Sequence, residues 1–356
     1  MTYTREQFHS KCFERENNQC IVPWCTKQPV DAHHIIERAE WEDGGYFPEN
    51  GASVCYKHHL MAEDNTIPPQ AFWYWLEQSP VTPKGVSKDV NKWGEEFKTP
   101  PHKGLRDFHK YPSSRHLMPL YWQGDESLAK ERLEHDDTGH KTIDTFIGLE
   151  LVITIKMDGG NTMLVKDTEH PVRARNGSQA NHKSYDQLKS LYWDMNLYEK
   201  IPKHCQIFGE WTYAKHSIHY GCKGCCKERN QGPSLGEIIP GDWGREMYFQ
   251  VFGVFNTKYN LWLSWDETKI IAKQIGFPTA PVIDENIEFN NEQEAIEKLM
   301  DVSKSIVDKG HEGIVVRYRN PFHYGQFSKR LGKYVRENHV TGGRWENNDI
   351  VNLLSE

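Results

Sequence analysis

Short apolar runs that end at charged residues recur through the second half of the chain. The run 149–155 ends at Lys156, and similar runs adjoin Glu210, Glu312 and Lys333. Apolar runs of this length, bounded by polar or glycine positions, predict buried β-strands. The charged residues would then lie at strand ends, where they can surround a single cleft.

Helical spacing of apolar residues lies between these runs. It predicts helices over 184–197, 264–275 and 291–309, and the opening Thr4-Arg5-Glu6-Gln7-Phe8 predicts a capped helix start. Prolines interrupt the chain after about residue 66, which predicts a linker. We therefore expect three regions. These are a small module over residues 1–65, a linker or docking segment over 66–108, and one α+β domain over 109–356.

Lys156 is the first candidate for chemistry. It stands in Lys156-Met157-Asp158-Gly159, where a predicted buried strand meets a glycine turn. Desolvation at the edge of an apolar core lowers the pKa of a lysine and frees its lone pair for nucleophilic attack. These four residues are equally consistent with a strand that ends in a surface lysine, so the interpretation depends on the segments that follow.

Five later segments support the interpretation of Lys156 as a nucleophile. In chain order they are Arg175-Asn176-Gly177, Ile207-Phe208-Gly209-Glu210-Trp211, Tyr248-Phe249-Gln250-Val251-Phe252, Glu312-Gly313-Ile314-Val315-Val316-Arg317 and Lys333-Tyr334-Val335-Arg336. Their order and chemistry resemble the covalent nucleotidyltransferase superfamily of polynucleotide ligases and capping enzymes. Further stretches that begin at Lys110, Tyr213, Leu263 and Val335 make phage-type ATP-dependent RNA ligases the more similar group.

The resemblance implies how a nucleotide would bind. Lys156 would take AMP from ATP as a lysyl phosphoramidate, and Glu210 would accept hydrogen bonds from the ribose hydroxyls. Phe252 would stack on adenine, with Phe249 as the alternative. The implied nucleotidyltransferase fold consists of ATP-grasp-like antiparallel sheets with flanking helices.

The resemblance also implies how phosphate charge would be neutralised. Glu312 would hold Mg²⁺ or Mn²⁺, because hard cations near phosphates take carboxylate oxygens. Lys333, assisted by Lys329, would neutralise the α-phosphate. Arg175 would clamp the ribose or the 5′-phosphate of the nucleic acid, for which a planar guanidinium is suited.

Composition restricts the class of protein. The chain has 356 residues, a formal net charge of −7 and 37% hydrophobic residues. No apolar run approaches the ~20 residues that span a bilayer, and no signal segment opens the chain. We therefore expect a cytoplasmic protein without a membrane partner. The negative charge disfavours broad nonspecific adhesion to nucleic acid, whereas the basic segment 328–336 could line a local groove.

A cysteine and histidine cluster marks the N-terminal module. Cys20, Cys25, Cys55 and His58 have the pairwise spacing of a tetrahedral Zn²⁺ site. A segment of about 60 residues builds little hydrophobic core, so a structural zinc would supply folding free energy.

The same region resembles the HNH nucleases. The resemblance is carried by Asp31-Ala32-His33-His34, Gly44-Gly45, Glu49-Asn50 and His58-His59. It implies a small ββα module in which His34 is the general base and Asn50 orients it. His33 and His59 would bind the catalytic metal.

The metal site of this module needs a third ligand. No further histidine follows shortly after His59, so Glu63 or Asp64 would have to complete the site. A zinc-stabilised module that binds nucleic acid without cutting it is therefore an equally open alternative.

The other cysteines are Cys12, alone near the start, and a second group. This group comprises Cys205, Cys222, Cys225 and Cys226. The last three fall in residues 221–245, which resemble an insertion relative to the family. A second zinc completed by Cys205 or His219 is one interpretation, and free thiols are the favoured one.

The predicted function is that of an ATP-dependent RNA ligase in RNA repair, which seals 5′-phosphate and 3′-hydroxyl ends through lysyl-AMP. Its cofactors would be ATP, Mg²⁺ or Mn²⁺, and Zn²⁺, and a monomer would act on RNA, an RNA/DNA hybrid or a nicked duplex. Only about 20 residues follow Arg336, where DNA ligases and capping enzymes carry an OB-fold domain. The alternatives are a bifunctional nuclease–ligase, a DNA ligase, a capping-type nucleotidyltransferase, and a nucleic-acid-binding protein with an inactive ligase domain.

Overall fold

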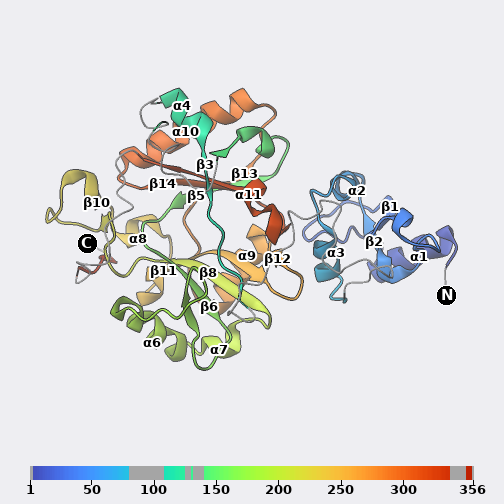
Figure 1. Cartoon of the computed structure of the whole chain (residues 1–356), viewed down its shortest axis with the longest axis horizontal. Coiled ribbons are helices and arrows are strands. Elements are labelled where there is room, and N and C mark those ends of the chain that lie inside the picture. The colour runs from blue at the N-terminus through green and yellow to red at the C-terminus, as the bar shows by residue number, and fades with distance from the viewer. Residues whose placement is uncertain (1–2, 80–107, 125–129, 131–139, 337–349, 355–356) are drawn as a thin grey trace. The chain divides into compact units, whose positions relative to one another are not determined.

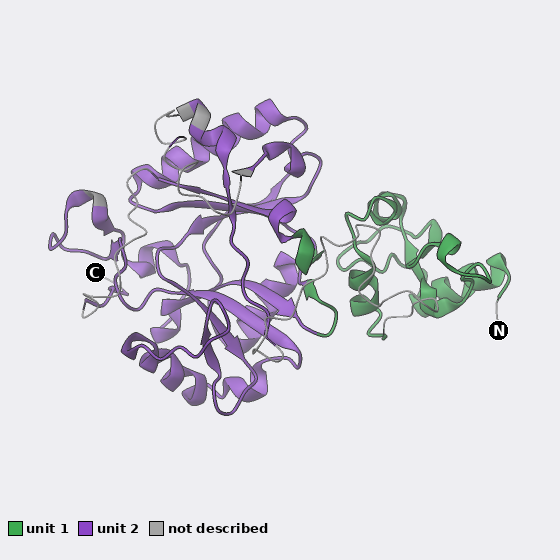
Figure 2. Cartoon of the chain, viewed as in Figure 1, with its two compact units in different colours: residues 1–100, 258–261, 321–326 green, residues 101–257, 262–320, 327–356 purple. Residues whose placement is uncertain are grey.

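The computed structural model describes residues 3–79, 108–124, 130, 140–336 and 350–354. The chain divides into two compact units, which Figure 2 shows in different colours. The first contains residues 1–100, 258–261 and 321–326, and the second contains the rest. Most of the predicted linker, residues 80–107, lies outside the described residues, and so do residues 337–349.

The first unit begins as its sequence predicts. Helix α1 (Arg5–Arg15) starts at a capping box in which Thr4 and Gln7 bond to each other's backbone amides. Strands β1 (Asp31–His34) and β2 (Gly51–Val54) pair antiparallel, and α2 (Tyr56–Glu63) follows directly. The predicted ββα arrangement is therefore present. The other elements of this unit are η1 (Arg38–Glu40), η2 (Pro48–Asn50), α3 (Pro69–Trp75), β15 (Phe322–His323) and η8 (Tyr324–Gln326).

Packing of α1 on β2 explains one glycine of the first unit. The buried side chains of Phe8 and Cys12 on α1 form a small core with Ala32 of β1. A Cβ atom at Gly51 would lie 2.4 Å from the Cys12 sulfur and 2.5 Å from the Phe8 ring. A larger residue at position 51 would therefore push α1 off the hairpin.

Two sheets form the centre of the second unit (Figure 1). The first has the order β13-β5-β14-β16-β3-β4, antiparallel from β13 to β16 and parallel beyond. Its strands are β13 (Val282–Ile287), β5 (Leu151–Lys156), β14 (Gly313–Tyr318), β16 (Leu331–Val335), β3 (Arg115–Leu117) and β4 (His140–Lys141). The strands that carry or adjoin Lys156, Glu312 and Lys333 are therefore neighbours.

The second sheet contains the order β12-β11-β8-β6-β7 within this unit. Its strands are β12 (Leu261–Trp262), β11 (Phe249–Asn256), β8 (Cys205–Trp211), β6 (Gly160–Val165) and β7 (Val172–Ala174). In Figure 1 the two sheets lie in separate layers, with α10 and α4 outside one and α6 and α7 outside the other. This arrangement is mixed α+β, as predicted.

The predicted helices of the second unit are confirmed with shorter bounds. They are α6 (Asp186–Asp194), α9 (Trp265–Ile275) and α10 (Glu292–Asp308), of which α9 begins at a Ser264 cap. The remaining elements are α4 (Met118–Gly124), η4 (Ile143–Phe146), η5 (Lys183–Tyr185), α7 (Leu197–Lys200), β9 (His219–Tyr220), η6 (Glu228–Asn230), β10 (Gln231–Gly232), α8 (Leu235–Ile238), η7 (Arg245–Tyr248) and α11 (Phe327–Arg330). Within the described parts of the chain, no helix combines the length and apolarity that crossing a membrane requires.

The turn after Lys156 connects the two sheets. Lys156 is the last residue of β5 in the first sheet, and β6 of the second sheet starts at Gly160. A Cβ atom at Gly159 would lie 2.6 Å from the carbonyl oxygen of Trp211. Glycine is therefore needed here, because the turn passes directly over the end of β8.

Candidate active site

One cavity of about 380 Å³ in the second unit takes side chains from both sheets. Lys156 and Lys333 reach it from the first sheet, and Glu210 and Phe252 reach it from the second. Arg175, which follows β7, also lines it. The cavity therefore collects the polar strand-end residues that the sequence predicts around one cleft.

Lys156 is paired with Glu312 at the edge of this cavity. The antiparallel register sets Lys156 opposite Gly313, and its Nζ lies 2.7 Å from both Oε1 and Oε2 of Glu312. Burial favours the neutral amine, but the carboxylates of Glu312 and Glu210 outweigh it and raise the lysine pKa above its ordinary value. The expectation of a lowered lysine pKa is therefore wrong for the nucleotide-free protein. It rested on burial alone, without the carboxylates that lie far away in sequence but close in space.

Glu210 is an acidic residue that lines the cavity. Burial raises its pKa from 4.5 to about 8, although the charge of Lys156 acts in the opposite direction. Its Oε1 accepts a hydrogen bond from the Gly159 amide at 3.1 Å. The carboxyl group thus holds the turn after Lys156 and still faces the cavity.

The two aromatic candidates on β11 occupy different environments. Phe252 lines the cavity and packs with Val152, Trp265 and Ala280. Phe249 is fully buried and contacts Phe277 at a ring-centroid distance of 5.1 Å. Of the two, Phe252 is therefore the residue placed to contact a ligand.

The basic candidates also differ in position: among the described residues, Arg175 and Lys333 line the cavity, and Lys329 does not. Arg175 donates from Nε to the Tyr111 carbonyl at 3.0 Å and from Nη2 to Ser113 Oγ at 2.7 Å. Lys329 lies on α11 before β16, where its carbonyl accepts from Lys141, and its assisting role stays a prediction.

Arg317 is a cavity residue to which the sequence motif that contains it assigned no role. It is 3% exposed, donates from Nη1 to the Phe252 carbonyl and lies 5.1 Å from the centre of the Trp265 ring. Burial lowers its pKa to about 10, so it remains charged at neutral pH. Its position on β14, five residues after Glu312, was the available signal for a place in the same cleft.

Asp158 was also missed as a structural partner of the site. Its Oδ2 accepts from the Ile218 amide at 2.5 Å, and its own amide donates to the Tyr220 hydroxyl at 2.9 Å. The turn that carries Lys156 is therefore held by the β9 strand, which comes about 60 residues later in the chain.

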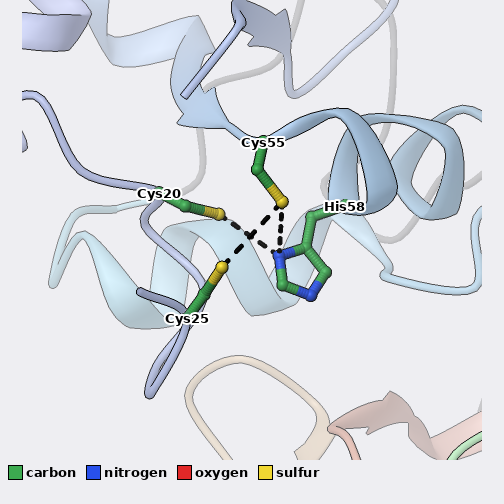
Figure 3. A group of neighbouring side chains, drawn as sticks. All are labelled: Cys20, Cys25, Cys55 and His58. Carbon is green, nitrogen blue, oxygen red and sulfur yellow. Dashed lines mark hydrogen bonds between the residues drawn. The ribbon is translucent and has the colours of Figure 1, made fainter. Parts of the chain in front are cut away.

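A second group of side chains lies in the first unit, where the predicted zinc ligands converge (Figure 3). The His58 Nδ1 atom is 3.2 Å from the Cys20 sulfur and 3.4 Å from the Cys55 sulfur. The Cys25 and Cys55 sulfurs are 3.9 Å apart. Ligand atoms around a tetrahedral zinc lie about 3.6–3.8 Å from each other, so these four residues fit such an ion.

The histidines of the HNH-like module line a separate cavity of about 420 Å³. Glu63 Oε1 lies 3.3 Å from His33 Nδ1 and 3.4 Å from His59 Nε2. These three side chains can hold one metal ion. Of the two acidic candidates, Glu63 is the one in the group, since Asp64 accepts from Thr66 after α2.

His34 lines the same cavity, but its ring contacts Phe8 and not the expected Asn50. Its ring stacks on Phe8 at 4.6 Å, and burial lowers its pKa to about 4, so the imidazole is neutral at pH 7. The Asn50 side chain bonds to both backbone groups of Ile36 and to the Gly45 carbonyl. The assignment of Asn50 to orient His34 is therefore wrong, because the fully buried amide is used to hold the β1–β2 connection.

The second cysteine group is completed by His219. Cys222, Cys225, Cys226 and His219 come together in the second unit. Cys205 lies instead at the start of β8, opposite Asn256, where burial raises the pKa of its thiol to about 12.

Comparison with known protein families gives a match that covers most of the residues lining the cavity of the second unit. The sequence profile of the RNA ligase family matches residues 149–335, which is more than half of the chain. The chain therefore belongs to the RNA ligase family. This result confirms the family-level prediction, while the phage-type subgroup remains a prediction.

Solved structures of RNA ligases are similar at low identity. A variant of Naegleria gruberi RNA ligase with ATP and Mn matches with a TM-score of 0.40 and 15% identity, over 65% of this chain and 56% of that one. An archaeal ATP-dependent RNA ligase matches with a TM-score of 0.41 and 15% identity, over 64% of this chain and 48% of that one. This chain thus spans about half the length of these ligases. No curated protein matches it.

Proposed function

We propose that this chain is an ATP-dependent RNA ligase that forms a lysyl-AMP intermediate at Lys156. The observation that carries the proposal is one cavity lined by Lys156, Glu210, Lys333 and Phe252, with Glu312 bonded to the Lys156 amine. A nucleophile, carboxylates, a phosphate-binding cation and an aromatic surface are the groups that nucleotidyl transfer needs in one place.

In the first step the Lys156 amine attacks the α-phosphorus of ATP. The N–P bond forms while the bond to the bridging α–β oxygen breaks, and pyrophosphate leaves. The proton of Lys156 must leave as well, and the Glu312 carboxylate at 2.7 Å is placed to accept it. Lys333 neutralises charge on the α-phosphate.

Carboxylate oxygens around Lys156 also fit a hard divalent cation. Glu312, Glu210 and Asp158 all act electrostatically on this lysine, and such ligands suit Mg²⁺ or Mn²⁺. When bound, the cation neutralises phosphate charge. Positive charge brought in beside Lys156 also disfavours its ammonium form, which helps deprotonation.

Two further transfers complete the reaction. An oxygen of the RNA 5′-phosphate attacks the phosphorus of lysyl-AMP, which breaks the N–P bond and restores the amine. The 3′-hydroxyl then attacks the 5′-phosphorus and AMP leaves. Arg175, whose guanidinium donates to Tyr111 and Ser113 in the cavity lining, would bind the incoming phosphate.

Self-labelling tests the proposal directly. The protein incubated with Mg²⁺ and ATP radiolabelled at the α-phosphate should become covalently labelled, and Lys156→Ala should not. Lys166→Ala is the matched control, because Lys166 pairs with Glu199 away from the cavity. Full labelling of Lys156→Ala would end the proposal. RNA, hybrid and nicked-duplex substrates then define the polynucleotide.

Phosphodiester cleavage by the HNH-like module is a second candidate function. It is favoured by His33, His59 and Glu63, which could hold one divalent metal, and by the neutral His34 in the same cavity. Such a metal polarises a phosphate. His34 would take the proton of an attacking water.

A nicking assay tests this second function. Wild-type protein with Mg²⁺ or Mn²⁺ should nick plasmid DNA or cut RNA, and His34→Ala should reduce the rate by on the order of 100-fold or more. His9→Ala, which changes a more exposed histidine on α1 that borders the same cavity, is the control. Absence of cleavage by the wild type leaves a module that only binds.

A further inference from the structure

We propose that His219, Cys222, Cys225 and Cys226 bind a second zinc ion and that this ion fixes the segment holding the Lys156 turn. His219 belongs to β9 and the three cysteines lie in the loop between β9 and β10, so the four residues fall within eight positions of the chain. Gly221 and Gly224 adopt positive φ angles of 73° and 92°, which glycine accepts without steric cost. The loop therefore folds back on itself and brings its ligands together.

Interatomic distances in this group fit a tetrahedral ion. The Cys225 sulfur lies 3.4 Å from Cys222 Sγ, 3.6 Å from Cys226 Sγ and 3.1 Å from His219 Nδ1. Cys226 Sγ is 3.7 Å from the same nitrogen. Around one zinc, sulfur atoms lie about 3.8 Å apart and sulfur lies about 3.6 Å from nitrogen. Small adjustments would thus place all four atoms on one ion.

The chemistry of the group selects zinc. Three thiolates and one imidazole are soft or borderline ligands, and no carboxylate takes part. Zn²⁺ with three thiolates carries one negative charge, which Lys223 and Lys227 in the same loop can balance. The set matches in kind the Cys20, Cys25, Cys55 and His58 group of the first unit.

The loop also needs a crosslink to keep its shape. Ile218 and Tyr220 are fully buried, but Cys222, Lys223, Gly224, Cys225 and Cys226 are exposed or half-buried. So short and exposed a loop buries little apolar surface that could hold its fold, and a structural metal compensates for this in small metal-dependent modules.

The position of His219 connects the ion to catalysis. Its two chain neighbours hold Asp158, through the Ile218 amide at 2.5 Å and the Tyr220 hydroxyl at 2.9 Å. Asp158 lies two residues after Lys156 and is 6% exposed. An ion that fixes His219 therefore fixes the partners of the Lys156 turn. This second half of the inference rests on the proposed ligase function.

Zinc stoichiometry tests the first half, independently of ligase activity. The full chain is purified under reducing conditions and dialysed against metal-free buffer. Inductively coupled plasma mass spectrometry should then find two zinc ions per chain. Cys222→Ser/Cys225→Ser and Cys20→Ser/Cys25→Ser should each contain one, and Cys205→Ala should contain two. One zinc in the wild type, unchanged by Cys222→Ser/Cys225→Ser, would overturn the site and leave free thiols or a disulfide.

A measurement on the wild-type protein protects this test from variants that fail to fold. Titration with an organomercurial, followed with a chromogenic zinc indicator, should release two ions per chain. Release of a single ion overturns the proposal without any substitution.

Adenylylation kinetics test the second half. In Cys222→Ser/Cys225→Ser the maximal rate of self-labelling should fall on the order of 10- to 100-fold, as for a misplaced reacting group, with the half-saturating ATP concentration unchanged. When Tyr220→Phe is already present, Cys222→Ser/Cys225→Ser should lower the labelling rate by a smaller factor, because both changes act through Asp158. Weaker ATP binding at an unchanged maximal rate would overturn a positioning role. If the wild type takes no label at all, the proposed function fails and the zinc count still stands.

Discussion

Lys156 keeps its proton in the nucleotide-free protein, which predicts a pH-limited first step. Burial lowers the pKa of Lys156, but the neighbouring Glu312 carboxylate outweighs it and raises that pKa above its ordinary value, so only a small fraction of the amine is neutral at pH 7. The rate of self-labelling at saturating ATP should therefore rise about tenfold per pH unit from pH 6 until the pKa in the complex is reached. Rapid-quench labelling measures this profile. A labelling rate independent of pH between 6 and 9 would contradict this prediction. The control is AMP transfer from preformed lysyl-AMP to RNA, which does not require deprotonation of Lys156 and should depend less on pH.

Glu210 predicts a conflict between stability and activity. Its folded-state pKa of about 8 exceeds the ordinary 4.5, so the native state binds the proton more tightly than the unfolded state does. That contribution is complete below pH 4.5 and is lost as the pH rises through 8. Glu210→Gln should therefore raise the Tm of the nucleotide-free protein, by roughly 2 °C or more at pH 8 and by less at pH 5.5, while labelling is lost.

Thermal scans at the two pH values check the Glu210 prediction. Glu288→Gln changes an exposed carboxylate and is the matched control. An equal Tm change at both pH values would show that the charge of Glu210 is not the cause.

The two phenylalanines of β11 should respond differently to truncation. Phe252→Ala should weaken ATP binding roughly 10-fold with little change in Tm, because stacking on a base contributes about 1–3 kcal/mol. Phe249→Ala should lower stability by about 3–5 kcal/mol, because its ring is fully buried against Phe277. Calorimetric titration with ATP and thermal unfolding separate these effects, and the opposite assignment would transfer the stacking role to Phe249.

At the scale of elements, the segment 350–354 predicts a strong stability effect at one residue. The fully buried Asn352 donates to the Thr212 carbonyl at 2.7 Å and accepts from the Tyr220 amide at 2.9 Å. Asn352→Ala leaves both groups unpaired, at about 1–3 kcal/mol each. Denaturant unfolding at pH 7 should show a loss of a few kcal/mol, a loss at least as large for Asn352→Asp, which buries a carboxylate against the Thr212 carbonyl, and almost none for the exposed Ile350→Ala. Equal effects of all three substitutions would contradict the argument.

Local pattern predicted the elements better than their partners. The apolar run before Lys156 gave β5 and the spacing after Ser264 gave α9, because burial of one face is encoded within each segment. The ion pair of Lys156 with Glu312 depends on a strand register that joins positions 156 residues apart. Its effect on the lysine pKa could not be derived from burial alone, and the same is true of the contact of Asp158 with β9.

A motif resemblance also transfers roles less reliably than positions. Asn50 lies in the segment that carries the HNH resemblance, yet its amide is used by Ile36 and Gly45. The deciding contacts are tertiary, so no local signal was available.

At the scale of the whole molecule, the two units should lose function separately. The predicted nucleotide-binding residues all belong to the second unit, whereas the first has its own core around Phe8 and a zinc group that includes Cys20 and Cys25. Cys20→Ser/Cys25→Ser should therefore unfold the first unit, since structural zinc supplies its folding free energy. Calorimetry should then show one transition fewer, with any nicking activity lost. Self-labelling of Lys156 should persist within about twofold of wild type, as expected for independent sites. If this variant lost the label together with its first transition, catalysis would depend on the N-terminal module, and the second unit could not be the complete nucleotidyl-transfer site.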